Sequence, residues 1–196
     1  MIKGIVTIVS ALAVALFAPA AATAATPTPG LSDQDRTFLV QAHQANLFEI
    51  AAGEAAQQKG TSQAIRDLGG KLITDHRKLD ENVRNVAEQL NVDLPDEPSE
   101  AQSEELDRIE GLSGAEFDRA WVTAQIAGHR QTLADGAKQL EQGQSEQVKQ
   151  LATDAKPVIE EHLQMLQELE QEATGTPTTT PTETTPPADT PDETPT

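Results

Sequence analysis

Apolar residues recur at every third or fourth position in four separate segments of this chain. That spacing matches the 3.6 residues per turn of an α-helix and places the apolar side chains on one face of each segment. Each segment has about 27 residues, so each helix would be roughly 40 Å long. Helices of this kind bury their apolar faces against one another, and the pattern therefore predicts an all-α protein built as a four-helix bundle.

Capping residues and glycines mark the ends of the predicted helices. Ser32 and Asp35 have the spacing of a capping box at the start of the first helix, and Ser113 and Glu116 repeat it at the start of the third. Gly60 separates the first two helices by a short junction, so these two should form an antiparallel hairpin. Another glycine divides the last two helices in the same way.

A long acidic connection joins the second and third predicted helices. Residues 91–113 carry eight acidic residues and one arginine, together with two prolines that interrupt any long helix. A short helix is expected within this connection, over residues 100–109. One long connection in this place is typical of a ferritin-like bundle, and the alternative is an up-down-up-down bundle with the acidic segment folded over one end.

The first residues differ in composition from the bundle and have the features of a signal peptide. An apolar run at residues 5–18 follows a single lysine, and small residues precede a cleavage position before Ala25. A membrane anchor is the alternative interpretation, but the run is shorter than the roughly 20 residues that a spanning helix needs. We therefore expect an exported protein, located in the periplasm, the cell envelope or outside the cell.

The last residues form a low-complexity segment. Residues 174–196 consist mainly of threonine, proline and acidic residues without large apolar side chains, so the segment should be disordered. It is compatible with an O-glycosylated stalk, with a spacer to the cell envelope, or with a plain solvated tail. The expected organisation is a signal peptide at 1–24, a linker at 25–31, the four-helix bundle at 32–173 and the tail at 174–196.

The charge of the chain limits its partners. It carries 32 acidic and 14 basic side chains, a formal charge of −18 at pH 7, and it has no cysteine. A strongly negative field argues against nucleic acid as a partner, and it is compatible with cations, or with the basic surface of a cell-envelope protein or another protein. The alternative, which we favour, is that the charge serves solubility or life in high salt. The lack of cysteine excludes disulfides, thiolate metal ligands and a lipid-modified cysteine. No transmembrane anchor is expected after signal cleavage, and the oligomeric state is left open.

Polar residues fall on the apolar face near the middle of each of the four predicted helices. They are Glu49, His76, His129 and His162. Because the middles of packed helices lie at one level whichever way each helix runs, we expect these side chains to meet in one buried cluster. Imidazole and carboxylate groups bind zinc, iron and copper, so the cluster is a candidate site for one transition-metal ion.

The same side chains can instead form a structural cluster, in which Glu49 accepts a hydrogen bond from one imidazole and Asp75 or Asp80 orients His76. A ferritin-type di-iron centre is not expected. The residue three positions before each clustered histidine is isoleucine, and not the glutamate of a Glu-x-x-His step. His43, the fourth histidine, lies one turn beyond the level of Glu49 and is left outside the candidate site.

Many positions of the predicted bundle follow one known order and spacing. They are Phe38, Ala42, the run NLFEIAAG at 46–53, Asp75-His76, Phe117-Asp118, His129, Pro157 and Glu161-His162. Over residues 31–171 this pattern resembles the bacterial exported proteins grouped as domain of unknown function 4142. The resemblance implies a ferritin-like fold and export, and it implies no activity, since the family has none assigned. The chain departs from the family at Asn46, often glycine, and at Trp121, usually tyrosine; neither is expected to bear on the polar cluster.

Two classes of function remain open. One is a non-enzymatic cell-envelope protein that acts as an interaction or stress-related module. The other is a mononuclear metal-binding or metal-dependent redox protein that uses the cluster in the bundle core. The sequence has no glycine-rich phosphate loop and no serine and histidine arranged as a nucleophile pair, so it offers no catalytic residues and favours the first class.

The ends of the chain generate a first prediction. Mass spectrometry of the protein from its own host should find a mature N-terminus at Ala25. Limited proteolysis should remove the segment after Gly175 first and leave the melting temperature unchanged, because that segment has no large apolar side chains to dock on the bundle. A lower melting temperature after trimming would show that the tail does pack.

Overall fold

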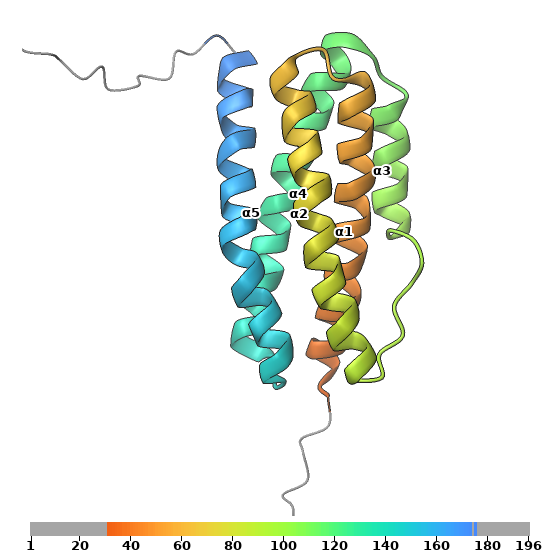
Figure 1. Cartoon of the computed structure of the whole chain (residues 1–196), viewed down its shortest axis with the longest axis vertical. Coiled ribbons are helices and arrows are strands. Elements are labelled where there is room, and N and C mark those ends of the chain that lie inside the picture. Colours follow the sequence, from red (N-terminus) through yellow and green to blue (C-terminus); the bar gives the residue numbers. More distant parts are fainter. Residues whose placement is uncertain (1–30, 174, 176–196) are drawn as a thin grey trace, which may run out of the picture.

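The computed structural model describes residues 31–173 and 175, and its regular structure there is entirely helical (Figure 1). The helices are α1 (Asp33–Lys59), α2 (Gln63–Gln89), α3 (Glu100–Glu110), α4 (Gly114–Gln142) and α5 (Glu146–Ala173). The all-α prediction is confirmed for this part of the chain, with a fifth, short helix beside the four long ones. None of these helices has both the length and the apolar character that a membrane span requires. The predicted signal peptide and nearly all of the predicted linker and tail lie outside the described residues.

The four long helices lie side by side along the long axis of the molecule (Figure 1). α1 packs against α2 and α4, and α5 packs against the same two helices. α1 and α5 run in one direction, whereas α2 and α4 run in the other. The chain between α2 and α4 therefore returns along the outside of the bundle before α4 begins.

The returning segment contains α3, which confirms the short helix expected within the acidic connection. Ser99 and Gln102 form a capping box at its start. α3 packs against α1 and α4, and Ile109 near its end is completely buried in the apolar core. This part of the connection therefore belongs to the packed structure.

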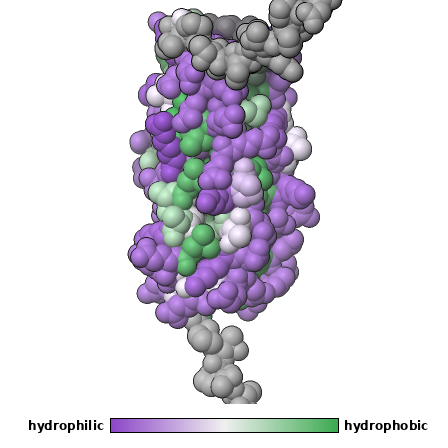
Figure 2. Space-filling model, turned by 90° about the vertical axis from the view of Figure 1, so that its left-hand side faces the viewer, coloured by the Kyte–Doolittle hydropathy of each residue, from purple (hydrophilic) through white to green (hydrophobic). Residues whose placement is uncertain are grey.

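Two apolar clusters fill the interior. The larger cluster includes Trp121, whose indole N–H donates to the carbonyl of Ala52 over 2.8 Å, and the smaller includes Phe38 near the start of α1. His76 and His162 lie along α2 and α5 between the residues of the two clusters, so a polar layer separates them. On the outside, a strip of apolar residues runs along one face between polar residues (Figure 2).

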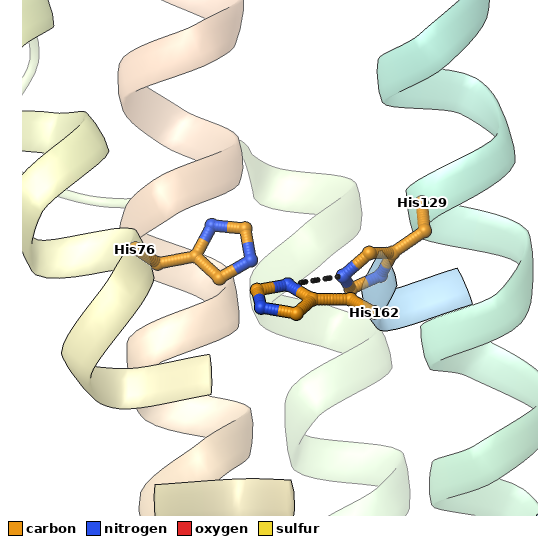
Figure 3. A group of neighbouring side chains, drawn as sticks. All are labelled: His76, His129 and His162. Atoms are coloured by element: carbon orange, nitrogen blue, oxygen red, sulfur yellow. Dashed lines mark hydrogen bonds between the residues drawn. The ribbon is translucent and has the colours of Figure 1, made fainter. Parts of the chain in front are cut away.

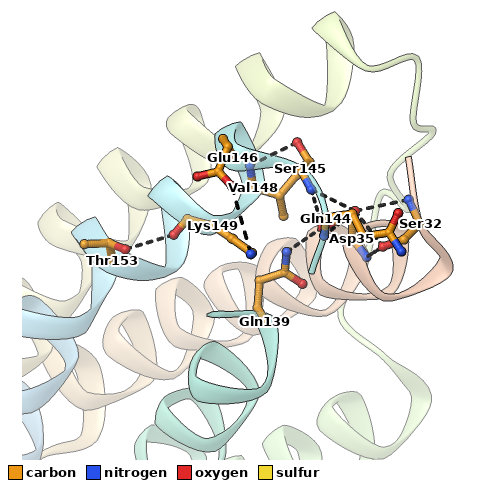
Figure 4. A network of polar contacts seen from close by, with 9 residues as sticks. All are labelled: Ser32, Asp35, Gln139, Gln144, Ser145, Glu146, Val148, Lys149 and Thr153. Atoms are coloured by element: carbon orange, nitrogen blue, oxygen red, sulfur yellow. Dashed lines mark hydrogen bonds and ion pairs between the residues drawn. The ribbon is translucent and has the colours of Figure 1, made fainter. Parts of the chain in front are cut away.

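Asp35 ties the start of α1 to the turn between α4 and α5 (Figure 4). Asp35 and Ser32 form the predicted capping box. The buried carboxylate also accepts hydrogen bonds from Gln139 Nε2 at 2.6 Å and from the backbone N–H groups of Gln144 and Ser145 at 3.1 and 3.2 Å. Burial alone would raise the pKa of Asp35, but hydrogen bonds from Ser32 and Gln139 outweigh it and lower the pKa. One ionised side chain thus closes this end of the bundle.

The second predicted capping box does not form. Ser113 is the N-cap residue of α4, but its side chain makes no capping hydrogen bond. The next residue, Gly114, has a positive φ of 59°, so the backbone enters the helix through a conformation that differs from the entry to α1. The spacing of Ser113 and Glu116 alone is therefore not sufficient to form a capping box at the start of α4.

α1 and α2 touch backbone to backbone where Gly53 faces Gly69. A Cβ atom on Gly53 would lie 2.7 Å from the Gly69 carbonyl oxygen, and one on Gly69 would lie 2.8 Å from the Gly53 carbonyl oxygen. Cβ atoms do not approach other atoms so closely, so this helix separation requires glycine at both positions. The close contact explains why two residues of poor helix propensity lie inside long helices.

The contact predicts a difference between two neighbouring glycines. Gly69→Ala should lower the free energy of unfolding by about 1–3 kcal/mol, because the added methyl group forces α1 and α2 apart. Gly70→Ala is the matched control, since a Cβ atom there meets only the flexible end of Gln57 and improves helix propensity. Urea denaturation measures both, and equal effects would contradict the backbone contact.

Candidate metal site

One histidine from each of α2, α4 and α5 reaches the centre of the bundle at the same level (Figure 3). His76, His129 and His162 lie on the apolar faces of their helices, and none is more than 2% exposed. Their ring centroids are 5.3 to 5.6 Å apart. One ring nitrogen from each histidine lies within 4.8 Å of those from the other two. The fold therefore brings these three predicted residues together.

Each ring donates its N–H outward, to an oxygen 2.9 Å away. The three pairs are His76 Nδ1 with Asn46 Oδ1, His129 Nδ1 with the carbonyl oxygen of Gln125, and His162 Nε2 with Asp75 Oδ2. Carbonyl, amide and carboxylate oxygens only accept hydrogen bonds, so the ring nitrogen that faces each of them carries a proton. A neutral imidazole has one N–H, and in all three rings that N–H points away from the centre.

The inward-facing nitrogens are consequently left with lone pairs. His129 Nε2 and His162 Nδ1 lie 3.4 Å apart, along the dashed line in Figure 3. With both rings neutral and both protons directed outward, no hydrogen remains to bridge these two atoms. His76 Nε2 is also buried and has no hydrogen-bond partner within residues 31–173. Three lone pairs therefore converge, an arrangement that is repulsive unless a proton or a cation lies among them.

Burial keeps the three rings neutral. Loss of hydration lowers the pKa of His76 well below its usual value, and the neighbouring His129 and His162 lower it further. Burial also lowers the pKa of His129 to about 4, and it lowers the pKa of His162 against the opposing effect of Asp75. A proton is therefore poorly held at the centre of the cluster at neutral pH.

Glu49 lies in the same buried layer, on the outer side of the cluster. Its Oε1 atom is 3.6 Å from His129 Nδ1, the nitrogen that faces away from the other two rings. Burial raises the pKa of the Glu49 carboxyl group well above its usual value. Of the four predicted site residues, Glu49 is thus the one that lies behind a histidine instead of among the converging nitrogens.

Unpartnered polar atoms are concentrated in this layer. In the described part of the chain, the buried side-chain atoms outside normal hydrogen-bond geometry are Glu49 Oε2, His76 Nε2 and both amide atoms of Gln125. Glu49 and Gln125 still interact, since the Gln125 side chain opposes the effect of burial on the pKa of Glu49. Such atoms are rare in proteins, because leaving a buried polar group unpaired costs about 1–3 kcal/mol. Their location separates the layer from the rest of the core, where polar groups are paired.

Asp75 connects the cluster to the surface. Its carboxylate accepts from His162 and forms an ion pair with Lys71 over 3.1 Å, and Lys71 also lies 3.2 Å from Glu161. Burial alone would raise the pKa of Asp75, but hydrogen bonds from His162 and Lys71 outweigh it and lower the pKa. An ionised carboxylate behind an imidazole fixes its tautomer and makes it a stronger metal ligand.

Two expectations about the neighbours of the cluster are wrong. Asp75 bonds His162, and Asp80 bonds a histidine outside the cluster, so neither orients His76. Asn46 orients His76 instead, although Asn46 was not expected to bear on the cluster. The missed signal was its position three residues before Glu49, which places both side chains on the same side of α1.

His43 lies outside the cluster and holds the acidic connection against the bundle. Its Nδ1 atom is 2.5 Å from Asp80 Oδ1 on α2, and its Nε2 atom is 2.8 Å from the carbonyl oxygen of Pro95. Both ring nitrogens are therefore engaged with other groups. His43 links α1, α2 and the first part of the connection.

The pKa shifts predict how the stability of metal-free protein depends on pH. Below pH 6.5 the histidines of the unfolded chain take up protons, whereas the lowered pKa values of the three clustered rings, about 4 for His129, favour their neutral form in the folded state. The unfolded state then binds more protons, so lowering the pH favours unfolding, by at most about 1.4 kcal/mol per pH unit for each ring. Glu49 has the opposite sign: its raised pKa contributes stability that is lost as the pH rises through that pKa.

Urea denaturation between pH 4 and 8 in the presence of a chelator measures both effects. His129→Leu should make the loss of stability below pH 6.5 shallower. Glu49→Gln should keep the loss of stability below pH 6.5, and it should remove the decline of stability on the alkaline side. A wild-type protein that gains stability on acidification from pH 6.5 would contradict the neutral rings.

Comparison with known proteins places the chain among proteins without an assigned activity. No curated protein matches it. Its fold is similar to the crystal structure of a DUF305 fragment from Deinococcus radiodurans, with a TM-score of 0.64 and 12% identity over 73% of this chain and 99% of that chain. The sequence profile described as domain of unknown function (DUF4142) matches residues 20–169. The resemblance seen in the sequence is confirmed, and the chain belongs to the DUF4142 family.

Proposed function

We propose that this protein binds one divalent transition-metal ion in the core of the bundle, with His76 Nε2, His129 Nε2 and His162 Nδ1 as ligands. The observation that carries the proposal is the convergence of three lone pairs on rings that oxygen acceptors hold from behind. Zinc, iron and copper all bind neutral imidazole. The geometry thus favours the metal-binding class over the interaction module that the sequence alone favours.

The spacing of the inner nitrogens supports an ion of this kind. Imidazole nitrogens lie about 2.0–2.1 Å from zinc, so two ligands of a tetrahedral ion are about 3.4 Å apart. His129 Nε2 and His162 Nδ1 already have that separation. A ring nitrogen of His76 lies within 4.8 Å of both, so a shift of this ring toward them would bring it to the same ion.

A purely structural cluster explains the geometry less well. Such a cluster would turn at least one N–H inward to meet a neighbouring lone pair, whereas all three are used outward. Well-packed apolar residues could replace three unprotonated rings in a dry core without loss of stability. A bound metal ion supplies the partner that the inner nitrogens otherwise lack.

The surroundings of the histidines support a single ion with an open coordination position. The residues three positions before the histidines are Ile73, Ile126 and Ile159, so the bridging carboxylates of a Glu-x-x-His di-metal site are not present at these positions. Three protein ligands leave a fourth position for an exogenous molecule, as in catalytic zinc sites. Asp75, whose lowered pKa keeps it ionised behind His162, can balance part of the charge of the ion.

We further propose that the four long helices form a ferritin-like bundle and that the protein is exported. The parallel course of α2 and α4, with a connection that returns along the outside, supports the first proposal. The apolar run and small residues within positions 1–24 support the second. Metal binding in the cell envelope, with or without redox chemistry, is the activity that these properties support together.

Metal analysis of protein purified without a polyhistidine tag tests the proposal. After loading with zinc and dialysis against a weak chelator, the wild type should retain one equivalent. His76→Leu should retain none, because two imidazoles hold zinc far less tightly than three. Saturating zinc at 100 times its Kd should stabilise the wild type by about 2.7 kcal/mol and leave the His76→Leu variant unchanged.

His43→Gln is the matched control, because it removes a buried histidine that lies outside the cluster. It should retain one equivalent of zinc. A wild type without bound zinc, or a His76→Leu variant that keeps it, would refute the site and leave the histidines as a structural layer.

A further inference from the structure

A cavity of about 200 Å³ lies between the four long helices, next to the histidine cluster. His76 is part of its wall, together with Leu79, Leu133 and Ile159. Leu79, Leu133 and Ile159 lie one turn from His76, His129 and His162, respectively. All three lie on the same side of the cluster, because α2 and α4 end on that side and α5 starts there. The cavity therefore adjoins one face of the cluster.

The wall of the cavity is mainly apolar, and its outer part reaches solvent. Phe38, Ala45 and Val83 contribute to the inner wall, and the exposed side chain of Leu140 contributes to the outer wall. An apolar cavity of about 150 Å³ is known to bind benzene in another protein, so this volume suits one or two small rings. The occupant should therefore have an apolar body of that size.

Charged residues at the outer part of the cavity restrict the charge of an occupant. Asp135, Asp154 and Glu160 line it, against the single cation of Lys156. Their field, together with the charge of −18 on the whole chain, disfavours an anion. A neutral or cationic molecule enters without that repulsion.

One residue of the cluster belongs to the wall of this space. His76 lines the cavity, and its Nε2 atom is buried without a hydrogen-bond partner among residues 31–173. Asn46, which also lines the cavity, holds the other nitrogen of the same ring. A metal ion held by the three histidines would therefore share one ligand, His76, with the wall of the cavity.

We propose that the cavity binds a small, uncharged or cationic organic molecule with an apolar ring and one nitrogen donor, and that this donor occupies the open position on the metal. The inference rests on the proposed function, because the donor needs the metal ion as its partner. Imidazole ligands select metals that also accept a further neutral nitrogen. Anionic oxygen donors, which bind such metals in many sites, are disfavoured by the acidic outer wall.

Cobalt(II)-loaded full-length protein tests this by its visible absorption. The band before any addition reports the metal site itself, so its absence would refute the proposed function and this inference with it. Benzimidazole should then change the band saturably at one equivalent. Benzimidazole-5-carboxylate, of similar shape but anionic, should bind at least about tenfold more weakly.

A variant that fills the cavity tests whether benzimidazole binds in this space or reaches the metal ion by another route. Gly136→Leu adds a side chain into the cavity, and its Cβ atom meets only Ala152 Cβ at 3.9 Å. It should bind cobalt as the wild type does and lose the response to benzimidazole at least about tenfold. Ala155→Leu, on the facing helix, fills the same space if the first variant does not fold.

Ala134→Leu is the matched control, since Ala134 is an exposed residue of α4 outside the cavity wall. It should keep both the cobalt band and the response to benzimidazole. A cobalt-loaded wild type whose band does not respond to benzimidazole would overturn the inference while the metal site stands. So would a filled-cavity variant that responds as the wild type does.

Discussion

A neutral imidazole has one hydrogen to donate, and in the core of this bundle three imidazoles all donate it away from their common centre. The oxygens that receive these hydrogens come from three helices, α1, α2 and α4. Because each acceptor is itself fixed on a helix, the tautomer of every ring is set by the fold. The convergence of lone pairs follows directly, and the proposed metal binding rests on it.

The rest of the fold holds this layer at a defined level. On one side of it the glycine contact between α1 and α2 brings the two backbones together, and Trp121 fills the larger apolar cluster. At one end of the bundle, Asp35 joins the start of α1 to the turn between α4 and α5. Paired and well-packed groups thus surround a layer in which polar atoms lack partners. Such a distribution is expected where stability has been given up for a binding site.

Most of the fold, and the main part of the candidate site, could be predicted from helical periodicity. The apolar stripes predicted four long helices, and the mid-helix positions of His76, His129 and His162 predicted their convergence, since packed helices share one level at their middles. Glu49 reached the same layer but lies behind a ring, because a stripe gives the level of a residue and not the direction of its side chain.

The partners of the rings could not be predicted in the same way. Asp75 precedes His76 in sequence, yet consecutive helical residues point about 100° apart, so its carboxylate reaches His162 on α5. Asn46 lies on α1, and only the packing of α1 against α2 shows that it faces His76. The cavity is likewise a property of four helices together. None of these contacts leaves a periodic signal in the chain.

Metal binding at this site depends on the tautomers of the three rings, and long-range ¹H–¹⁵N NMR of metal-free protein near pH 7.5 measures them directly. We expect protonated Nδ1 in His76 and His129 and protonated Nε2 in His162, with the other nitrogen of each ring unprotonated. Zinc should then shift the resonances of the unprotonated nitrogens most. A proton found on His129 Nε2 or His162 Nδ1 would mean that the two rings share an ordinary hydrogen bond, and it would contradict the account.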